Sequence, residues 1–181
     1  MTIKDIKISW DNYYQHGDIN VVEGDLETDD GLTTAILISL FSDARAADDD
    51  ELPDPLNSNK RGWWGGQYLS DDEEDTPFCK LWLLERSKTT QEVLTKAKNY
   101  VEDALQWLID DEIASSVDVE IERQGPVESQ ILAIKVGITV SDTRYIELLF
   151  GYNPEELDGG IDYLYVNGEK ISFGTEDYLH F

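Results

Sequence analysis

Residues 131–140 read Ile-Leu-Ala-Ile-Lys-Val-Gly-Ile-Thr-Val, and from Leu132 onward every second residue is large and apolar. A period of two is typical of a β-strand that buries one of its faces. The same alternation occurs on both sides of this stretch, at Val117, Val119 and Ile121 and at Ile146, Leu148 and Phe150. Three such segments joined by short links, one of them containing Gly125-Pro126, predict an antiparallel meander.

A long helix is predicted immediately before the meander, over about residues 90–110. Thr89-Thr90-Gln91-Glu92 matches a capping box, in which threonine and glutamate side chains satisfy free backbone N–H groups at a helix start. Apolar residues then recur at helical spacing, namely Leu94, Ala97, Val101, Ala104, Leu105 and Leu108. We expect this helix to cover the apolar face of the sheet.

The N-terminal part predicts one strand, one loop and a second helix. Residues 3–10 alternate as a strand does, whereas residues 11–31 are polar and acidic and predict a loop. Asp29 or Asp30 is placed to cap a helix that starts near Leu32. Its apolar residues fit one helical face, although their β-branched content is also compatible with a strand.

The C-terminal part predicts a β-hairpin. Alternating residues at 163–166 and 170–173 flank Asn167-Gly168, and Asn-Gly between such segments is a strong hairpin signal. The predicted fold class is therefore α+β: a long helix packed on an antiparallel sheet of three to four strands, with one further N-terminal helix and a C-terminal β-hairpin. The length of 181 residues suits a single domain, with an N-terminal arm (1–30), a core (31–155) and the hairpin (158–181).

The chain is strongly acidic. It has 39 acidic and 14 basic residues, a net charge of −25, which disfavours nucleic acid and anionic membranes as partners. Solubility alone can account for such a charge. Two other hypotheses are recognition of a basic partner and mimicry of nucleic acid to inhibit a DNA-binding protein.

The cysteine content, the N-terminus and the apolar runs argue against disulfide-linked, secreted and membrane-spanning proteins. Cys79 is the only cysteine, so an intrachain disulfide is impossible, and a lone cysteine is typical of a small core residue. The N-terminus lacks the apolar region of a secretory signal. The longest apolar run, residues 35–40, is too short to span a bilayer.

Two aromatic segments are the main candidates for function: Arg61-Gly62-Trp63-Trp64-Gly65-Gly66 and Leu81-Trp82-Leu83-Leu84-Glu85-Arg86. Tryptophan is the side chain that most often anchors a protein interface, and glycine beside it allows close backbone approach. An irregular, linker-like stretch (46–60) and a second acidic run (71–75) surround the first segment, as around a binding loop. The candidate interface residues are Arg61, Trp63, Trp64 and Arg86, together with Asn167 of the hairpin.

Each of these candidates also has a structural interpretation. The two arginines can form local ion pairs. Trp82 and Trp107 fit apolar patterns and are expected in the core. Trp63 and Trp64 are adjacent, so in an extended segment they point in opposite directions, and one of them can be buried.

No motif for chemistry stands out, and we predict no catalytic residue, metal site or cofactor. Phosphate loops, zinc motifs and nucleophile elbows are missing, and His16 and His180 lie near opposite ends of the chain. Residues 25–31 resemble a calcium loop, but the glycine falls one place late and Ile36 stands where a glutamate ligand belongs. A cell-wall glycan hydrolase remains an alternative because it needs only two carboxylates.

Several stretches together resemble the small baseplate wedge protein family of phage Mu and related prophages. The matching text is Asp30-Gly31-Leu32-Thr33-Thr34-Ala35, Ser39-Leu40-Phe41-Ser42-Asp43-Ala44-Arg45-Ala46, Arg61-Gly62-Trp63-Trp64-Gly65, Leu81-Trp82-Leu83-Leu84 and Ala104-Leu105-Gln106-Trp107-Leu108-Ile109. It spans about residues 5–150. That family is similar, more distantly, to lysozyme-like wedge proteins of contractile tails.

The resemblance implies a structural subunit of a contractile phage or prophage tail baseplate that links wedge, hub and sheath during assembly, without catalysis. It implies several copies per particle in the virion baseplate, and in the host cytoplasm during assembly. The implied partners are other wedge proteins, tail sheath and hub or spike proteins, with no nucleic acid and no membrane. One departure is that Ile109-Asp110-Asp111 stands where the wider superfamily has Glu-Pro-Arg, so the contacts of that triplet cannot be transferred.

Overall fold

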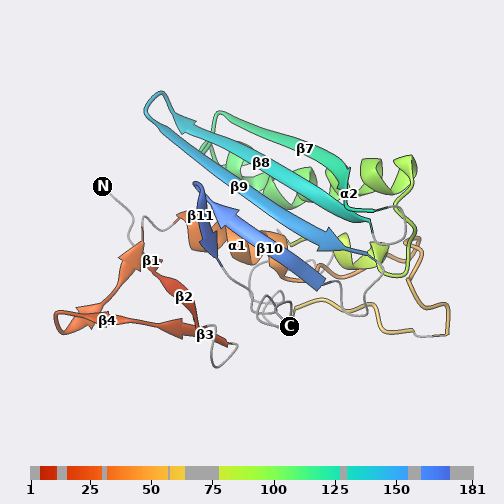
Figure 1. The fold of residues 1–181 in the computed structure, drawn as a ribbon, viewed down its shortest axis with the longest axis horizontal. Coiled ribbons are helices and arrows are strands. Elements are labelled where there is room, and N and C mark those ends of the chain that lie inside the picture. Colours follow the sequence, from red (N-terminus) through yellow and green to blue (C-terminus); the bar gives the residue numbers. More distant parts are fainter. Residues whose placement is uncertain are drawn as a thin grey trace.

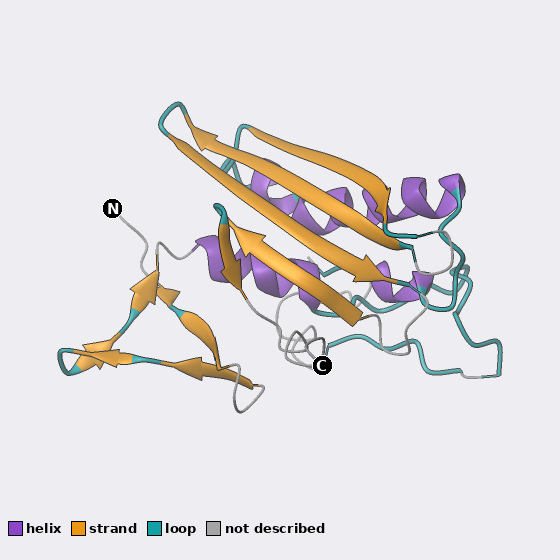
Figure 2. Cartoon of the chain, in the orientation of Figure 1, coloured by secondary structure: helices purple, strands orange, loops and turns teal. Residues whose placement is uncertain are grey.

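The computed structural model describes residues 5–11, 16–29, 32–56, 58–63, 78–126, 130–154 and 160–171. Two long helices lie against one face of an antiparallel sheet, and a small arm of short strands projects from this body (Figure 1). Figure 2 shows the division by element type: helices and sheet in the body, and strands with turns in the arm.

The sheet has five antiparallel strands in the spatial order β11-β10-β9-β8-β7. The bounds are β7 Ser116–Gln124, β8 Ile131–Ser141, β9 Arg144–Asn153, β10 Gly160–Val166 and β11 Glu169–Ile171. In the centre, Val136 pairs with Val119 on one side and with Leu148 on the other, so apolar residues share one face. The predicted meander is confirmed, and the C-terminal hairpin extends the same sheet.

The hairpin turn has the backbone that Asn-Gly provides. Asn167 and Gly168 both have positive φ, 50° and 81°, as a two-residue type I′ turn requires. The turn matches the right-handed twist of the two strands, so β10 and β11 pair in register from Val166↔Glu169 onward. The predicted C-terminal hairpin is confirmed.

Helix α2, Gln91–Leu105, follows the predicted pattern, but its start differs by one residue. Thr90 is the N-cap, and its side chain accepts a hydrogen bond from the backbone N–H of Val93. Thr89 instead donates its hydroxyl to Gln130, so the predicted Thr89–Glu92 box does not form. The helix breaks at Gln106 and resumes as α3, Trp107–Asp110.

The predicted N-terminal helix is confirmed as α1, Leu32–Phe41, and a short 3-10 helix, η2 (Leu81–Leu84), lies between α1 and α2 in sequence. The core forms where α1, α2 and η2 meet the inner face of the sheet. Phe41 of α1 meets Phe150 of β9 edge to face, with 5.2 Å between ring centroids. The largest fully buried apolar side chains are Ile36, Val101, Leu105, Leu108, Leu132, Ile134, Val136, Ile138, Leu148, Phe150 and Leu164. The fold class predicted from the sequence is confirmed.

The prediction of a loop over residues 11–31 is wrong for most of that range. The arm contains three two-stranded ribbons, β1–β6, β2–β3 and β4–β5. Their bounds are β1 Asp5–Ile6, β2 Ile8–Asp11, β3 His16–Ile19, β4 Val21–Val22, β5 Asp25–Leu26 and β6 Thr28–Asp29. Alternation fails as a signal because strands of two to four residues are too short to show an apolar period. Within the described residues, no helix is long and apolar enough to cross a membrane.

Candidate protein-interaction site

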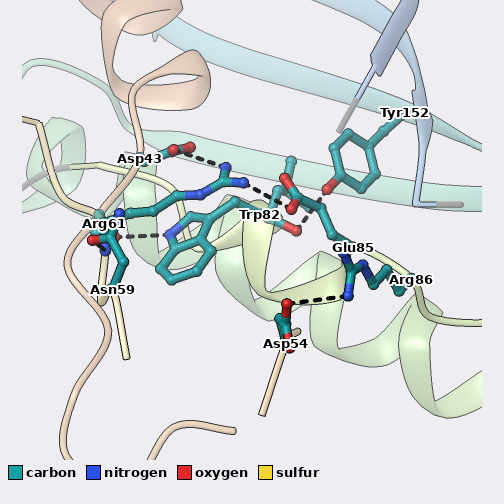
Figure 3. Close-up of polar contacts among 10 residues, drawn as sticks. Asp43, Asp54, Asn59, Arg61, Trp82, Glu85, Arg86 and Tyr152 are labelled. Atoms are coloured by element: carbon teal, nitrogen blue, oxygen red, sulfur yellow. Dashed lines mark hydrogen bonds and ion pairs between the residues drawn. The ribbon is translucent and has the colours of Figure 1, made fainter. Parts of the chain in front are cut away.

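Arg61 is the centre of a polar cluster between the loops and the sheet (Figure 3). One guanidinium nitrogen, Nη1, lies 3.1 Å from Oδ2 of Asp43, and Nη2 lies 2.8 Å from Oε2 of Glu85. The guanidinium also lies 5.0 Å from the centre of the Trp82 ring, a cation–π distance. A single arginine therefore joins two carboxylates and an indole that are distant in sequence.

The backbone at Arg61-Gly62 has an unusual conformation, with positive φ at both residues. Arg61 has a left-handed φ of 44°, and its N–H donates to Oδ1 of Asn59 at 2.9 Å. Gly62 follows with φ of 100°, and a Cβ placed there would lie 3.2 Å from Cβ of Arg45. Glycine is therefore needed at this position for two reasons: its backbone conformation and its close approach to Arg45 of the same chain.

Two aromatic side chains connect η2 to the rest of the cluster. Trp82 is buried, and its Nε1–H donates to the carbonyl of Ala44 at 2.8 Å. Tyr152 of β9 is also buried, and its hydroxyl donates to the carbonyl of Leu81 at 2.9 Å. The predicted core position of Trp82 is confirmed. The cluster thus connects the segment after α1, the Arg61 turn, η2 and the central part of the sheet.

Three titratable groups in or beside the cluster, Arg61, Cys79 and Tyr152, have shifted pKa values that keep them in their ordinary neutral-pH states. Burial alone would lower the pKa of Arg61, but the hydrogen bond to Asp43 and the charge of Glu85 raise it overall, so the guanidinium stays charged. Burial raises the pKa of the Cys79 thiol to about 12, which leaves the thiol protonated and unreactive at neutral pH. Burial also raises the pKa of Tyr152. The expected core position of Cys79 is confirmed.

Ion pairs hold the acidic stretch over residues 46–60 together and connect it to the body. Lys60 pairs with Asp48 within the stretch, and Lys80 of the body pairs with Asp50 at 2.8 Å. The side chain of Arg86 approaches Asp54 at 3.4 Å. The described residues of this stretch form no helix or strand, as predicted, but its acids serve as partners for basic residues of the body.

Trp63 follows Gly62 directly and is the exposed aromatic residue beside the cluster. It is 39% exposed, and its ring meets the buried Phe78 edge to face at 5.4 Å. Trp64 lies outside the described residues. Trp107 is partly buried against the core, as its pattern predicts, and its Nε1–H donates to Ser39.

The structure separates the predicted interface residues into two places. Arg61 and Trp63 lie together, and Arg86 follows η2 at the edge of the same cluster. Asn167 lies apart on the sheet, where its Oδ1 accepts from the backbone N–H of Glu147 at 2.9 Å and its own N–H donates to the Glu147 carbonyl. Both arginines form the local ion pairs considered as the alternative, and an interface role for these residues stays a prediction.

Sequence reasoning did not identify Asp43, Glu85 and Tyr152 as members of the cluster. Asp43 and Glu85 lie inside the quoted segments, but nothing in a chain with 39 acids distinguishes a carboxylate that will meet an arginine. Tyr152 follows the alternation of β9, which indicates burial without indicating a partner for its hydroxyl.

Fold and cluster together define a small α+β domain in which polar contacts fix loop architecture and present an aromatic side chain at the surface. The chain matches the family model described as Phage protein GP46 over residues 32–145, and it belongs to this family. It is 39% identical over 147 residues to the Baseplate protein gp46 of Escherichia phage Mu, an alignment that covers 81% of this chain and 94% of that protein. It is 38% identical over 117 residues to the Mu-like prophage FluMu protein gp46 of Haemophilus influenzae, covering 65% of this chain and 75% of that protein.

Proposed function

We propose that the chain is a structural subunit of a contractile phage or prophage tail baseplate. The observation that carries this proposal is the alignment to the Baseplate protein gp46 of phage Mu, which includes 94% of that protein. Because almost the whole relative aligns, the proposed role requires no domain that this chain lacks. The location that follows is the tail baseplate of the virion, and the host cytoplasm during assembly.

In finer detail, we infer a wedge subunit without enzymatic activity, present in several copies per particle. Its partners would be other wedge proteins, the tail sheath and the hub or spike proteins. The Arg61 cluster supports a structural role and not a catalytic one, because its charged and aromatic groups contact one another. Its central guanidinium occupies the space between Asp43 and Glu85, where a glycan hydrolase would need its substrate bond.

Three surfaces could serve such contacts. Trp63 is 39% exposed and its ring is held against Phe78, and a tryptophan that is ordered beforehand loses little conformational entropy on binding. Strand β7 is nine residues long and pairs with β8 on one side only within the described sheet, so its other edge could accept a strand from a neighbour. The C-terminal hairpin with Asn167 ends the opposite side of the sheet.

The test is the incorporation of variants into tails. Trp63→Ala should keep the fold, with a lower thermal midpoint because the contact with Phe78 is lost, and should reduce incorporation of the protein into particles. Tyr145→Ala is the matched control, because Tyr145 is also an exposed aromatic residue (54%) but lies on the sheet, away from the cluster. Normal incorporation of Trp63→Ala, with its fold intact, would refute the assignment of this contact.

A second measurement addresses the proposed function as a whole. Purified particles should contain the chain in the baseplate fraction, and purified protein should release no product from peptidoglycan. Release of peptidoglycan fragments that is lost in a carboxylate variant such as Glu85→Gln would favour the glycan hydrolase instead.

A further inference from the structure

The N-terminal arm is a further surface that the proposed function does not use. Its three ribbons meet at Glu27, whose N–H donates to the carbonyl of Asn20 and whose carbonyl accepts from the N–H of Lys7. The Glu27 carboxylate lies 2.8 Å from Nζ of Lys7 and accepts from Nδ2 of Asn20 at 3.1 Å. One glutamate therefore fixes the geometry of the junction, and the β4–β5 ribbon extends from it as a separate projection (Figure 1).

The β4–β5 ribbon has two different faces. Val21 pairs directly with Leu26, so both side chains lie on one face, while Val22 pairs with Asp25 on the other. Val21 is 65% exposed and Leu26 is 43% exposed. The turn between the strands, Glu23-Gly24, has positive φ at both residues (54° and 87°), the type I′ geometry that keeps the two strands in register.

This apolar pair is unusual because nothing in the described chain covers it. An isolated two-stranded ribbon is marginally stable in water, and it gains stability when an apolar face is buried against another surface. The arm projects away from the helices and the sheet in Figure 1, and within the described residues Val21 and Leu26 stay exposed. A surface from outside the described residues would bury this face.

The charge of the arm decides which occupant fits. Residues 5–29 contain seven acidic residues and one lysine, in a chain whose net charge is −25. A second copy would place like charges opposite one another, and an anionic lipid surface would also be repelled. A protein surface with an apolar pocket bordered by lysine and arginine satisfies both the Val21–Leu26 face and the acids beside it, which include Glu23 and Asp25.

We propose that the N-terminal arm is a docking element for a basic protein partner, with Val21 and Leu26 as the apolar anchor and the neighbouring acids as the charged rim. The arm is separate from the Trp63 surface, so this inference stands whether or not the partner is a baseplate protein. The rim charges steer association, and the apolar pair supplies most of the specific affinity.

The first experiment uses photo-crosslinking at defined positions in the full chain, in host cells that also express the genes next to it. Benzoylphenylalanine replaces Val21 in one variant and Val22 in another, and the crosslinked peptides are sequenced. We expect position 21 to crosslink to one protein, at a segment with an excess of lysine and arginine, and position 22 to crosslink much more weakly. Crosslinks to a second copy of this chain, to an acidic segment or to nothing would overturn the proposal.

The second experiment measures binding of the purified chain to the protein so identified. Val21→Ser should weaken binding about tenfold, because the apolar contact of one valine is lost, whereas Val22→Ser should change it less than about threefold. Both residues are exposed valines on the same strand, so their effects on folding should be equally small. Affinity should also fall as salt rises, because the acidic rim is screened.

Two outcomes would contradict the inference at this stage: equal losses for the two serine variants, or affinity independent of salt. A partner that is not a tail component would leave the docking proposal standing and would count against the baseplate function. The two proposals therefore fail separately.

Discussion

Nη2 of Arg61 lies 2.8 Å from Oε2 of Glu85, and the Glu85 side chain is only 8% exposed. This pair connects residues 24 positions apart, and the glutamate follows directly after η2. A carboxylate at this depth requires a cation, because its desolvation would otherwise be costly. Arg61 supplies that cation and also reaches Asp43, so the pair fixes the loop to the core.

Removing this cation should be among the more damaging single changes near the surface. Arg61→Ala should lower the free energy of unfolding by about 2–3 kcal/mol, a value below that of a fully buried pair because the arginine is partly exposed. Arg61→Lys should lose less but should not restore stability, since an ammonium cannot bridge two carboxylates as a planar guanidinium does. Urea unfolding measures both variants.

A double-mutant cycle with Arg61→Ala and Glu85→Gln measures the interaction energy between these two side chains apart from their other contacts. The two changes together should destabilise by clearly less than the sum of the single changes, because the first change has already removed the interaction. Additive losses would show that Arg61 acts through Asp43 or through its packing on Trp82, and not through Glu85.

The hydroxyl of Tyr152 should contribute measurably to stability. It is buried and donates to the Leu81 carbonyl, so Tyr152→Phe removes one buried hydrogen bond and leaves the carbonyl poorly satisfied. The expected loss is about 1–2 kcal/mol. Tyr145→Phe removes the same hydroxyl from an exposed ring and should change stability by less than about 0.5 kcal/mol. Equal effects of the two changes on the thermal midpoint would contradict the role given to Tyr152.

Two substitutions at Asn167 should separate the effect of backbone strain on stability from the effect of the side-chain hydrogen bond. Asn167→Gly keeps the positive φ but loses the bond to the Glu147 N–H, and should cost about 0.5–1 kcal/mol. Asn167→Ala loses the bond and also adopts a disfavoured φ, and should cost about 1–2 kcal/mol. The order of thermal midpoints should be wild type, glycine, alanine. If alanine equals glycine, strain at this position is unimportant.

The sequence predicts the meander, the long helix and the hairpin because their signals are local. Alternation at Leu132 to Val140, a helical stripe around Val101 and the Asn-Gly pair each depend on a few neighbouring residues. The start of α2 was misplaced by one residue because two threonines stand side by side. Both can cap a helix, and the choice depends on Gln130, which binds Thr89 from a distant segment.

The cluster and the arm were harder to predict for different reasons. The sequence makes Arg61 a candidate and allows a local ion pair, but the fold and not the spacing selects its partners among 39 acids. The β4–β5 ribbon carries no apolar alternation because neither face is buried in the chain. Positive φ at Glu23 and Gly24 makes it a hairpin, and Glu-Gly is not among the pairs that signal such a turn in a sequence.

The ion pair between Asp50 and Lys80 should make stability depend on pH in a defined direction. Burial alone would raise the pKa of Asp50, but the hydrogen bond from Lys80 and the one from the Ala47 N–H lower it below its ordinary value of 3.8. A folded-state pKa below the unfolded one means that the ionised carboxylate stabilises the fold. This contribution is complete above about pH 5 and is lost as pH falls through the lower, folded-state pKa.

Asp50→Asn should therefore destabilise the protein at pH 7, and the difference from wild type should shrink below about pH 4. Asp49→Asn is the matched control, since it removes the same charge from an exposed neighbour. In so acidic a chain, loss of one charge also relieves general repulsion, and subtraction of the Asp49→Asn effect at each pH removes that contribution. Urea unfolding of the three proteins between pH 3 and pH 7 measures the remaining contribution of the Asp50 carboxylate to the free energy of unfolding. A difference between the two asparagine variants that is constant over this range would show that ionisation of the Asp50 carboxyl does not stabilise the fold.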